Sequence, residues 1–314
     1  MANTGSKLFC ALTQEQLQTI AADSLGENFK SAELLSGGLF NTTYRLDTEG
    51  GRYILRVGPV HRELLLYYET GLMQAEETVY RMMEENGIPG SHVRTMGSVN
   101  GREYMIVDYI DSKPLSALQL PPEEYAILHE EIVNAMSALH RIRGDRFGRL
   151  AEVLRGRGFP DWFSHILHET QTVLWQGVIG GSFTPEEAEY VLSAVTAAQP
   201  ALAEVTAPSL CHGDLWGGNI LVRPDGHLAA VIDLDRALYG DIDFDLGNPW
   251  LGLTDRYQQP ADGPSRTIRR EIYGMMYFIF EANAWHVQFM NEENARNGKK
   301  TMLEIAERIL RLTA

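Results

Sequence analysis

The sequence contains few cysteines, only two among 314 residues. Cys10 and Cys211 lie far apart and form neither a CxxC pair nor another spacing typical of a metal site. This scarcity argues against a small disulfide-stabilised fold and gives no sign of a zinc site. We expect both thiols to be free and reduced.

Long apolar runs are also missing. The densest, residues 272–280, is bounded by Glu271 and Glu281 and is shorter than the roughly 20 residues of a membrane-spanning helix. Residues 1–12 lack the basic region and apolar stretch of a signal peptide. We therefore expect a cytoplasmic protein without a membrane partner.

Positive charge is scarce as well. Lys and Arg number 27 against 42 Asp and Glu, for a formal net charge of −15. A nucleic-acid or anionic-membrane partner would need a basic face, so we expect neither. Between Arg157 and Arg223 there is no Lys or Arg, and this interval is either a solvated acidic surface or part of a site for a cationic substrate. Its acidic residues are Asp161, Glu169, Glu186, Glu187, Glu189, Glu204 and Asp214.

The composition that remains is that of an ordinary globular protein, 44% hydrophobic and 22% charged, in a chain long enough for two lobes. The most informative segment begins at residue 209. Apolar runs at 209–211, 220–223 and 227–232 predict three short strands, and Pro224-Asp225-Gly226 predicts the turn between the last two.

The polar residues of this segment predict a metal site. Asp214 and Asn219 lie on the loop between the first two strands, and the hairpin brings Asp233 back beside them. Carboxylate and amide oxygens on one side of a sheet suit a hard cation such as Mg²⁺. A metallophosphoesterase would need another motif order and more histidines, so we disfavour that class.

An Asp, an Asn five positions later, a hairpin and a second Asp is the order found in kinase-type phosphoryl transfer. The segments 212–219 (HGDLWGGN) and 232–234 (IDL) resemble the aminoglycoside phosphotransferase family, whose relatives include choline and fructosamine kinases. The resemblance implies that Asp214 orients the acceptor hydroxyl and receives its proton. It also implies that Asn219 and Asp233 hold Mg²⁺ on the phosphates of ATP, with GTP as an alternative donor.

Two branches of that family are represented. Residues 212–219 are most similar to fructosamine kinases, whereas 233–236 (DLDR) resembles antibiotic kinases, which carry Arg at the position of Arg236. The resemblance implies that Arg236 contacts the transferred group. Asp235 departs from that pattern, which has Gly there.

The N-terminal third resembles a phosphate-binding sheet. The resemblance implies a phosphate cover that includes Gly37, Gly38 and Asn41, because glycine lets backbone N–H groups approach an anion. An ordinary hairpin turn is the alternative for the two glycines. The predicted strands are 30–35, 42–46 and 52–57, and a helix is predicted to start at Thr13 and run to about residue 23.

The third strand carries Arg56 where the kinase pattern has Lys. Arg keeps the charge and can form a forked contact with phosphate, so we predict that Arg56 binds the triphosphate. Its partner should be a Glu on the helix predicted at 72–85. In the pattern of the resembled family, spacing back from the Gly-Ile-Pro that ends this helix selects Glu76 over Glu77. An exposed helix carboxylate is the alternative for either residue.

Two further strands, 92–99 and 102–109, are predicted around the Asn100-Gly101 turn. In the family, the backbone that follows reads the adenine edge. This places adenine recognition at Asp108, Tyr109 and Ile110.

The predicted domain organisation follows from these segments: a nucleotide-binding N-lobe at 1–107, a hinge at 108–114 and a C-lobe at 115–314. Residues 239–249 are predicted to form a loop that matches a later family motif, with Asp241 bracing the catalytic loop. Glu281, Asn283, Trp285 and His286 are candidates for the substrate wall. The predicted C-lobe helices are 121–142, 161–176, 184–197, 265–290 and 300–312.

We thus predict an α+β, protein-kinase-like fold with two lobes, a small antiparallel sheet followed by a mainly helical part. The predicted activity is transfer of the γ-phosphoryl group of ATP, with Mg²⁺, to a hydroxyl of a small polar molecule, for which the acidic interval suggests a cation such as an aminoglycoside. A fructosamine-type repair kinase is the alternative within the class. A nucleotide-binding scaffold without turnover is the alternative outside it.

Overall fold

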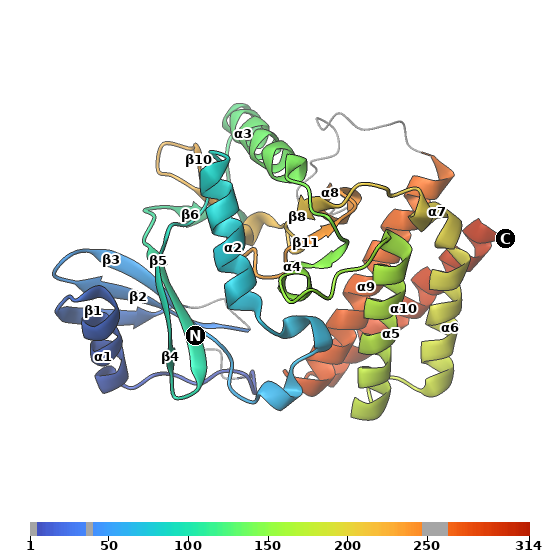
Figure 1. The fold of residues 1–314 in the computed structure, drawn as a ribbon, viewed down its shortest axis with the longest axis horizontal. Coiled ribbons are helices and arrows are strands. Elements are labelled where there is room, and N and C mark those ends of the chain that lie inside the picture. The colour runs from blue at the N-terminus through green and yellow to red at the C-terminus, as the bar shows by residue number, and fades with distance from the viewer. Residues whose placement is uncertain (1–4, 36–39, 247–262) are drawn as a thin grey trace.

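The N-terminal part of the chain is built on a five-stranded antiparallel sheet. Its elements are α1 (Gln14–Leu25), β1 (Phe29–Leu34), β2 (Thr42–Thr48), β3 (Arg52–Val57), α2 (Leu72–Glu85), β4 (Val93–Val99) and β5 (Arg102–Asp108). The strand order is β1-β2-β3-β5-β4, and every pairing is antiparallel. The computed structural model describes residues 5–35, 40–246 and 263–314, and Figure 1 shows this sheet at one end of the molecule.

Alternating burial sets the register of the sheet. Along β2, fully buried and half-buried residues alternate, so that Tyr44 and Leu46 pack in one cluster with Leu17 of α1. The helix begins with a capping box in which Thr13 and Gln16 satisfy each other's backbone N–H groups. One face of the sheet is therefore covered by α1, as the pattern of the sequence predicts.

The other face is covered by α2. Val79 and Met83 of α2 belong to a buried cluster that includes Met105 of β5 and also Ile132 and Ile220 from the C-terminal part. The two parts of the chain therefore share one core at this point.

The C-terminal part is mainly helical. Its elements are β6 (Lys113–Pro114), α3 (Pro122–Arg141), β7 (Gly148–Arg149), α4 (Leu150–Val153), α5 (Trp162–Gly180), α6 (Pro185–Ala197), α7 (Gln199–Ala203), β8 (Ser209–Cys211), β9 (Ile220–Val222), β10 (Leu228–Val231), β11 (Leu238–Gly240), α8 (Asp243–Leu246), α9 (Pro264–Val287) and α10 (Glu292–Thr313). Two small sheets have the strand orders β10-β9-β6 and β7-β11-β8, and Figure 1 shows β6 and β10 on the side of the N-terminal sheet and β8 and β11 nearer to α9. Around α9, the helices α5, α6 and α10 enclose a third cluster that contains Trp162 and Ile272.

This arrangement is the predicted α+β fold, with several local differences. Residues 239–246, predicted as loop, form the end of β11 and the short helix α8, while 247–249 lie outside the described residues. The last helix begins at Glu292 rather than near 300. On α5, which ends at Gly180 rather than near residue 176, Trp175 is 36% exposed.

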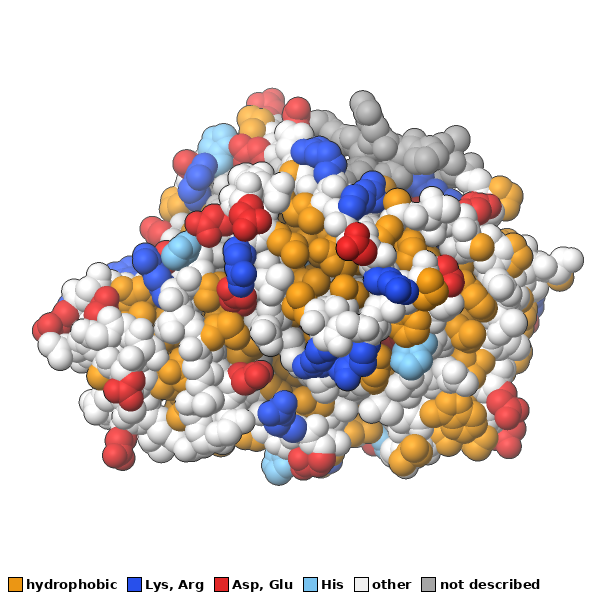
Figure 2. Space-filling view, viewed as in Figure 1, with side chains coloured by type: hydrophobic (Ala, Val, Ile, Leu, Met, Phe, Trp, Pro, Cys, Tyr) orange, Lys and Arg blue, Asp and Glu red, His pale blue; other side chains and the backbone are white. Residues whose placement is uncertain are grey.

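The described surface is mixed in character. Figure 2 shows acidic and basic side chains interspersed with apolar ones on one face. In the parts of the chain that the structure describes, no helix is both long enough and apolar enough to cross a bilayer.

His165 of α5 is buried beside Phe159 and Trp162, with ring centroids 5.6 and 5.2 Å away. Neither ring nitrogen has a hydrogen-bond partner among the described residues, although Glu169 Oε2 lies 3.5 Å from Nε2. Burial lowers the pKa of His165 to about 4, against the opposing charge of Glu169.

We predict that this histidine makes the folded chain sensitive to acid. The unfolded histidine binds a proton near pH 6.5 and the buried one only near pH 4. The contribution of His165 to the free energy of unfolding is therefore fully present above about pH 6.5 and declines as the pH falls between these values. By linkage the loss at pH 5 is about 2 kcal/mol. Urea unfolding of wild type and His165→Gln at about pH 7.5 and about pH 5 should show the smaller loss in the variant. Equal losses in the two proteins would contradict this.

Candidate active site

The loop between β8 and β9 brings the predicted catalytic and metal residues together. Asn219 is buried, and its Nδ2 donates to the carbonyl oxygen of Asp214 at 2.8 Å. The backbone carbonyl oxygen of Asn219 accepts from the N–H of Ile232 at 2.9 Å. Ile232 is the residue that precedes Asp233. The hairpin therefore returns Asp233 to the loop that carries Asp214 and Asn219.

Asp245 fixes the start of this loop. Its carboxylate accepts from the N–H groups of His212 at 2.7 Å and Gly213 at 2.9 Å, and its Oδ2 lies 2.9 Å from His140 Nε2. Burial favours the protonated form of Asp245, but these polar contacts outweigh it and hold its pKa below the ordinary value. The sequence prediction that Asp241 braces the loop is therefore wrong in the residue. Asp245, four positions later, braces the loop instead. The sequence prediction treated 239–249 as one loop and so did not predict the short helix that positions Asp245.

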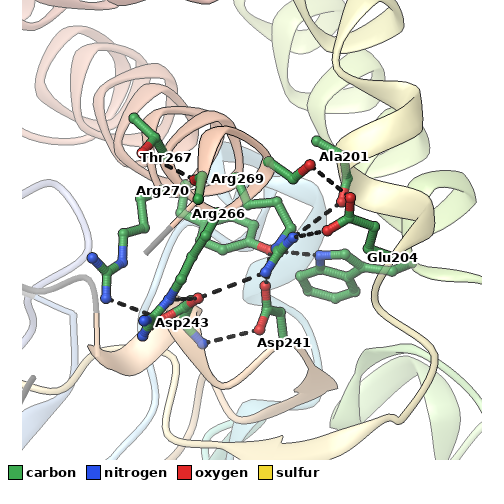
Figure 3. A network of polar contacts seen from close by, with 12 residues as sticks. Ala201, Glu204, Asp241, Asp243, Arg266, Thr267, Arg269 and Arg270 are labelled. Atoms are coloured by element: carbon green, nitrogen blue, oxygen red, sulfur yellow. Dashed lines mark hydrogen bonds and ion pairs between the residues drawn. The ribbon is translucent and has the colours of Figure 1, made fainter. Parts of the chain in front are cut away.

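The carboxylate of Asp241 instead joins a network on α9, which Figure 3 shows from close by. It accepts from Arg269 Nε at 2.9 Å and from the Tyr273 hydroxyl at 2.7 Å. Asp243 forms a two-pronged pair with Arg266 at 2.7 and 2.8 Å. These contacts tie α8, and with it the Asp245 brace, to α9.

Arg56 lies at the meeting point of three carboxylates. Its guanidinium forms ion pairs with Glu76 of α2 and with Asp233, and it lies 3.5 Å from Asp235. Glu76 is fully buried and also accepts from the Tyr80 hydroxyl at 2.8 Å. The sequence spacing selected the residue that the structure pairs with Arg56, since Glu77 pairs with Arg81 at the surface instead.

The three carboxylates of this cluster differ in the direction of their pKa shifts. Burial opposes ionisation of Asp233, but Arg56 and Arg236 outweigh it and hold the pKa of Asp233 below its ordinary value. Burial, together with the charges of Asp233 and Glu76, raises the pKa of Asp235 well above the ordinary value. Burial, with the charge of Asp233, also raises the pKa of Glu76 against the opposing charge of Arg56, so of the three carboxylates Asp233 is the one whose ionised form this cluster favours.

These residues fit a divalent cation. Asp233 is half-buried and has a lowered pKa, and Glu76 and Asp235 each place a carboxylate oxygen within 4.8 Å of one of its own. Because the amide nitrogen of Asn219 is engaged by the loop, its oxygen is the end available as a ligand. Carboxylate and amide oxygens form the donor set that Mg²⁺ prefers.

The residues predicted to contact nucleotide are only partly described. Gly37 and Gly38 lie outside the described residues, and Asn41 lines a small cavity of about 40 Å³ beside Met73. The Asp108 and Tyr109 N–H groups donate to carbonyl oxygens of the chain at 3.0 and 3.3 Å. The Ile110 N–H has no acceptor in the part of the chain that the structure describes, so it is the available donor of this segment.

Arg236 lines the same cavity as Asp214, and its backbone is held by a buried ion pair. Arg149 forms a forked pair with Glu169, with distances of 2.7–3.1 Å, and its Nη1 donates to the carbonyl oxygen of Arg236 at 2.8 Å. The Arg236 guanidinium lies 5.5 Å from the centre of the Tyr68 ring and 3.7 Å from Glu69. Sequence reasoning missed this pair, although Glu169 between apolar Ile166 and Val173 on a predicted helix was a signal for it.

A cavity of about 450 Å³ opens beside Asp214 and Arg236. Aromatic side chains form the largest group among its lining residues, and many come from α9 and the residues that follow it. Among the sequence-predicted wall residues, Glu281 and Trp285 line it, whereas Asn283 hydrogen-bonds to α5 and His286 pairs with Glu292. The aromatic lining residues are Phe40, Tyr68, Phe244, Tyr273, Tyr277, Phe278, Phe280, Trp285 and Phe289.

The acidic interval of the sequence does not form this cavity. Of its seven members only Asp214 is a lining residue. Glu169 is paired with Arg149, Asp161 caps α5, and Glu204 accepts from Ser265. The interval therefore gives no support to a cationic substrate, and any such preference must come from other lining residues.

Comparison with known proteins places the fold and the site in context. A model of the phosphotransferase enzyme family matches residues 31–280. A probable ketoamine kinase of Staphylococcus aureus (strain NCTC 8325 / PS 47) is 25% identical over 231 residues, 70% of this chain and 73% of that protein.

Solved structures share the fold at lower identity. The apo form of a thermostable mutant of aminoglycoside phosphotransferase APH(4)-Ia has a TM-score of 0.68 and 19% identity, covering 93% of this chain and 98% of that one. A protein from Haemophilus somnus 129PT assigned as a fructosamine-3-kinase has a TM-score of 0.71 and 14% identity, covering 94% and 96%. The predicted protein-kinase-like, two-lobed fold is confirmed.

We predict that Gly213 cannot be replaced without disturbing the loop. Its φ is +83°, and a Cβ there would lie 2.9 Å from the carbonyl carbon of Arg236 and closer to its oxygen. Gly226 has a similar φ of +86° but open space around it. Gly226→Ala should cost only the about 1–2 kcal/mol of a left-handed backbone, whereas Gly213→Ala should cost more in urea unfolding because backbone must also move. Equal losses of stability would count against a close-packed loop.

Proposed function

Because this chain belongs to the phosphotransferase enzyme family, we propose that it transfers the γ-phosphoryl group of ATP, with Mg²⁺, to an alcohol group of a small molecule. The observation that carries the proposal is the position of Asp214. It lies on the loop that carries the candidate metal ligand Asn219, and it also lines the cavity of about 450 Å³. A hydroxyl held in that cavity would face a carboxylate that adjoins both the cavity and the candidate metal site.

The nucleotide side of the proposal rests on the cluster around Arg56. Arg56 contacts the phosphates, and Asp233 with Asn219 holds Mg²⁺. In this proposal, residues 1–107 form the nucleotide-binding lobe, 108–114 the hinge that reads adenine and 115–314 the acceptor lobe. Support comes from a similar structure, a thermostable mutant of aminoglycoside phosphotransferase APH(4)-Ia in ternary complex with AMP-PNP and hygromycin B, which is 19% identical with a TM-score of 0.68 and covers 92% of this chain. GTP is the alternative donor.

Asp214 orients the acceptor hydroxyl and receives its proton as the hydroxyl oxygen bonds to the γ-phosphorus. The bond from that phosphorus to the bridging oxygen breaks, and ADP leaves with the electron pair. Arg236 neutralises charge on the transferred group, which spreads over its oxygens in a loose transition state. Mg²⁺, when bound, neutralises charge on the phosphates. Because such a transition state needs little proton removal before attack, positioning supplies most of the rate.

A fructosamine-type repair kinase is the alternative acceptor class. It is favoured by the His212–Asn219 segment of the sequence and by similarity to the probable ketoamine kinase. A scaffold that binds nucleotide without turnover remains the alternative outside the class, and it would leave Asp214 without a role. The two free thiols, Cys10 and Cys211, are consistent with a cytoplasmic location.

Replacing Asp214 tests the proposed chemistry. Asp214→Ala should lower kcat by about 10²–10⁴-fold, because the group that orients the hydroxyl and accepts its proton is lost, while the affinity for Mg·ATP measured by calorimetry stays unchanged. The matched control is Asp225→Ala in the exposed β9–β10 turn, where the carboxylate contacts Arg223 and the His227 N–H. Turnover near the wild-type rate in Asp214→Ala would remove Asp214 from the mechanism.

Replacing Arg56 tests the nucleotide side. Arg56→Ala should raise KM for ATP and also destabilise the fold by about 3–5 kcal/mol, because it leaves buried carboxylates unpaired. Arg56→Lys, which keeps one charge, should be intermediate in both. The control is Arg52→Ala on the same strand, whose 62% exposed side chain pairs with Asp47 at the surface and should contribute about 0–1 kcal/mol. Steady-state kinetics and urea unfolding measure both effects, and an unchanged KM in Arg56→Ala would refute the phosphate contact.

A further inference from the structure

One helix face supplies much of the cavity wall. Tyr277, Glu281 and Trp285 follow one another at intervals of four on α9, so they lie on one side of it. Phe289 extends this wall beyond the helix and packs edge-on against Trp285, with ring centroids 5.1 Å apart. Tyr277 is 56% exposed, which core packing does not explain. An exposed aromatic in a cavity wall indicates a surface for an apolar group.

Most of the charges that line the cavity are already neutralised within the chain. Arg149 is paired with Glu169, and Asp243 is paired with Arg266 and Arg270. Glu69 accepts from the Leu66 N–H at 2.9 Å and from Gln288 Nε2 at 2.6 Å, and it also lies 3.7 Å from Arg236. These residues leave little charge for a ligand.

Glu281 differs from them. Its Oε1 accepts from Trp285 Nε1 at 3.1 Å, and within the described ranges no Lys, Arg or His lies within ion-pair distance of it. The Tyr277 hydroxyl senses charges on both sides of it. Its partial burial raises the pKa of Tyr277, and the negative charges of Glu281 and Asp214 raise it further, whereas the positive charge of Arg236 opposes them. A carboxylate held by a tryptophan and flanked by aromatic rings is suited to an ammonium group.

We infer that the acceptor is an amphipathic monoamine, with its hydroxyl at Asp214, its ammonium group at Glu281 and an apolar or aromatic group along Tyr277 and Trp285. The inference rests on the proposed phosphotransfer and names its substrate class. A polyamine would need several carboxylates, but beyond Glu281 and Asp214 the described lining offers only carboxylates with partners of their own. The aromatic walls would also desolvate the additional charges without compensation.

A series of ketoamines tests this directly. N-methyl-, N-benzyl- and N-(4-aminomethylbenzyl)-1-amino-1-deoxyfructose share their hydroxyls and first amine, and differ in apolar area and in a second ammonium group. Both kcat/KM with Mg·ATP and binding by calorimetry with AMP-PNP would be measured, with kanamycin A as the polycationic comparison. The kcat/KM of the N-benzyl compound should exceed that of the N-methyl compound by about tenfold or more, because only the benzyl group covers the aromatic wall. The second ammonium group should remove that gain, and kanamycin A should be poorest.

Two variants locate the preference. Glu281→Gln should weaken binding of the N-benzyl compound by about tenfold or more, mainly through KM, because the ammonium group loses its counter-charge. Tyr277→Leu should reduce the difference between the benzyl and methyl compounds. The matched control is Glu271→Gln on the same helix, where the wild-type carboxylate pairs with Arg308 of α10 at 2.8 Å. This variant should leave unchanged both the binding of the N-benzyl compound and the difference between the benzyl and methyl compounds.

The outcomes separate the inference from the proposed function. Binding of the N-benzyl compound that depends on Glu281, without phosphoryl transfer, would uphold Glu281 as the ammonium site and count against the proposed phosphotransfer. Transfer at equal efficiency to all compounds, or best to kanamycin A, would overturn the inference and leave the function intact. Absence of binding by every member of the series would overturn the inference as well.

Discussion

A single guanidinium joins the two lobes at the point where chemistry is proposed to occur. Arg56 extends from β3 to Glu76 on α2 and to Asp233 and Asp235 beyond β10, so one cation holds a strand, a helix and a loop from both parts of the chain. Removing one partner of a buried ion pair leaves an uncompensated charge and costs several kcal/mol. The position of Asp233, and with it any metal it binds, therefore depends on Arg56.

The helix α9 has a comparable role on the acceptor side. Through Arg266 and Arg269 it holds α8, and α8 carries Asp245, which fixes the loop before Asp214. The opposite end of the same helix presents Glu281 and Trp285 to the cavity. Loop geometry and the proposed acceptor recognition thus both depend on α9, whose residues contribute to the core as well as to the cavity.

The sequence predicted the parts of the site that local pattern determines. Motif order and the hairpin signal placed Asp214, Asn219 and Asp233 together, and spacing in the pattern of the resembled family paired Arg56 with Glu76. It did not identify the brace, since Asp245 reaches the loop across 33 positions, nor the cavity wall, since an aromatic residue on a helix has the same pattern in core or cavity. The acidic interval pointed to a cationic substrate for the wrong reason: charge counted along the chain does not say which carboxylates share a surface or are neutralised by partners.

The most direct test of the central claim is phosphorus NMR of the protein with ATP, Mg²⁺ and the N-benzyl ketoamine. The account predicts a new phosphomonoester resonance that grows in equal amount with ADP and requires both acceptor and Asp214. Formation of inorganic phosphate without the monoester would show hydrolysis instead of transfer to an alcohol. An unchanged spectrum, with no ATP bound by calorimetry, would contradict the account at its foundation.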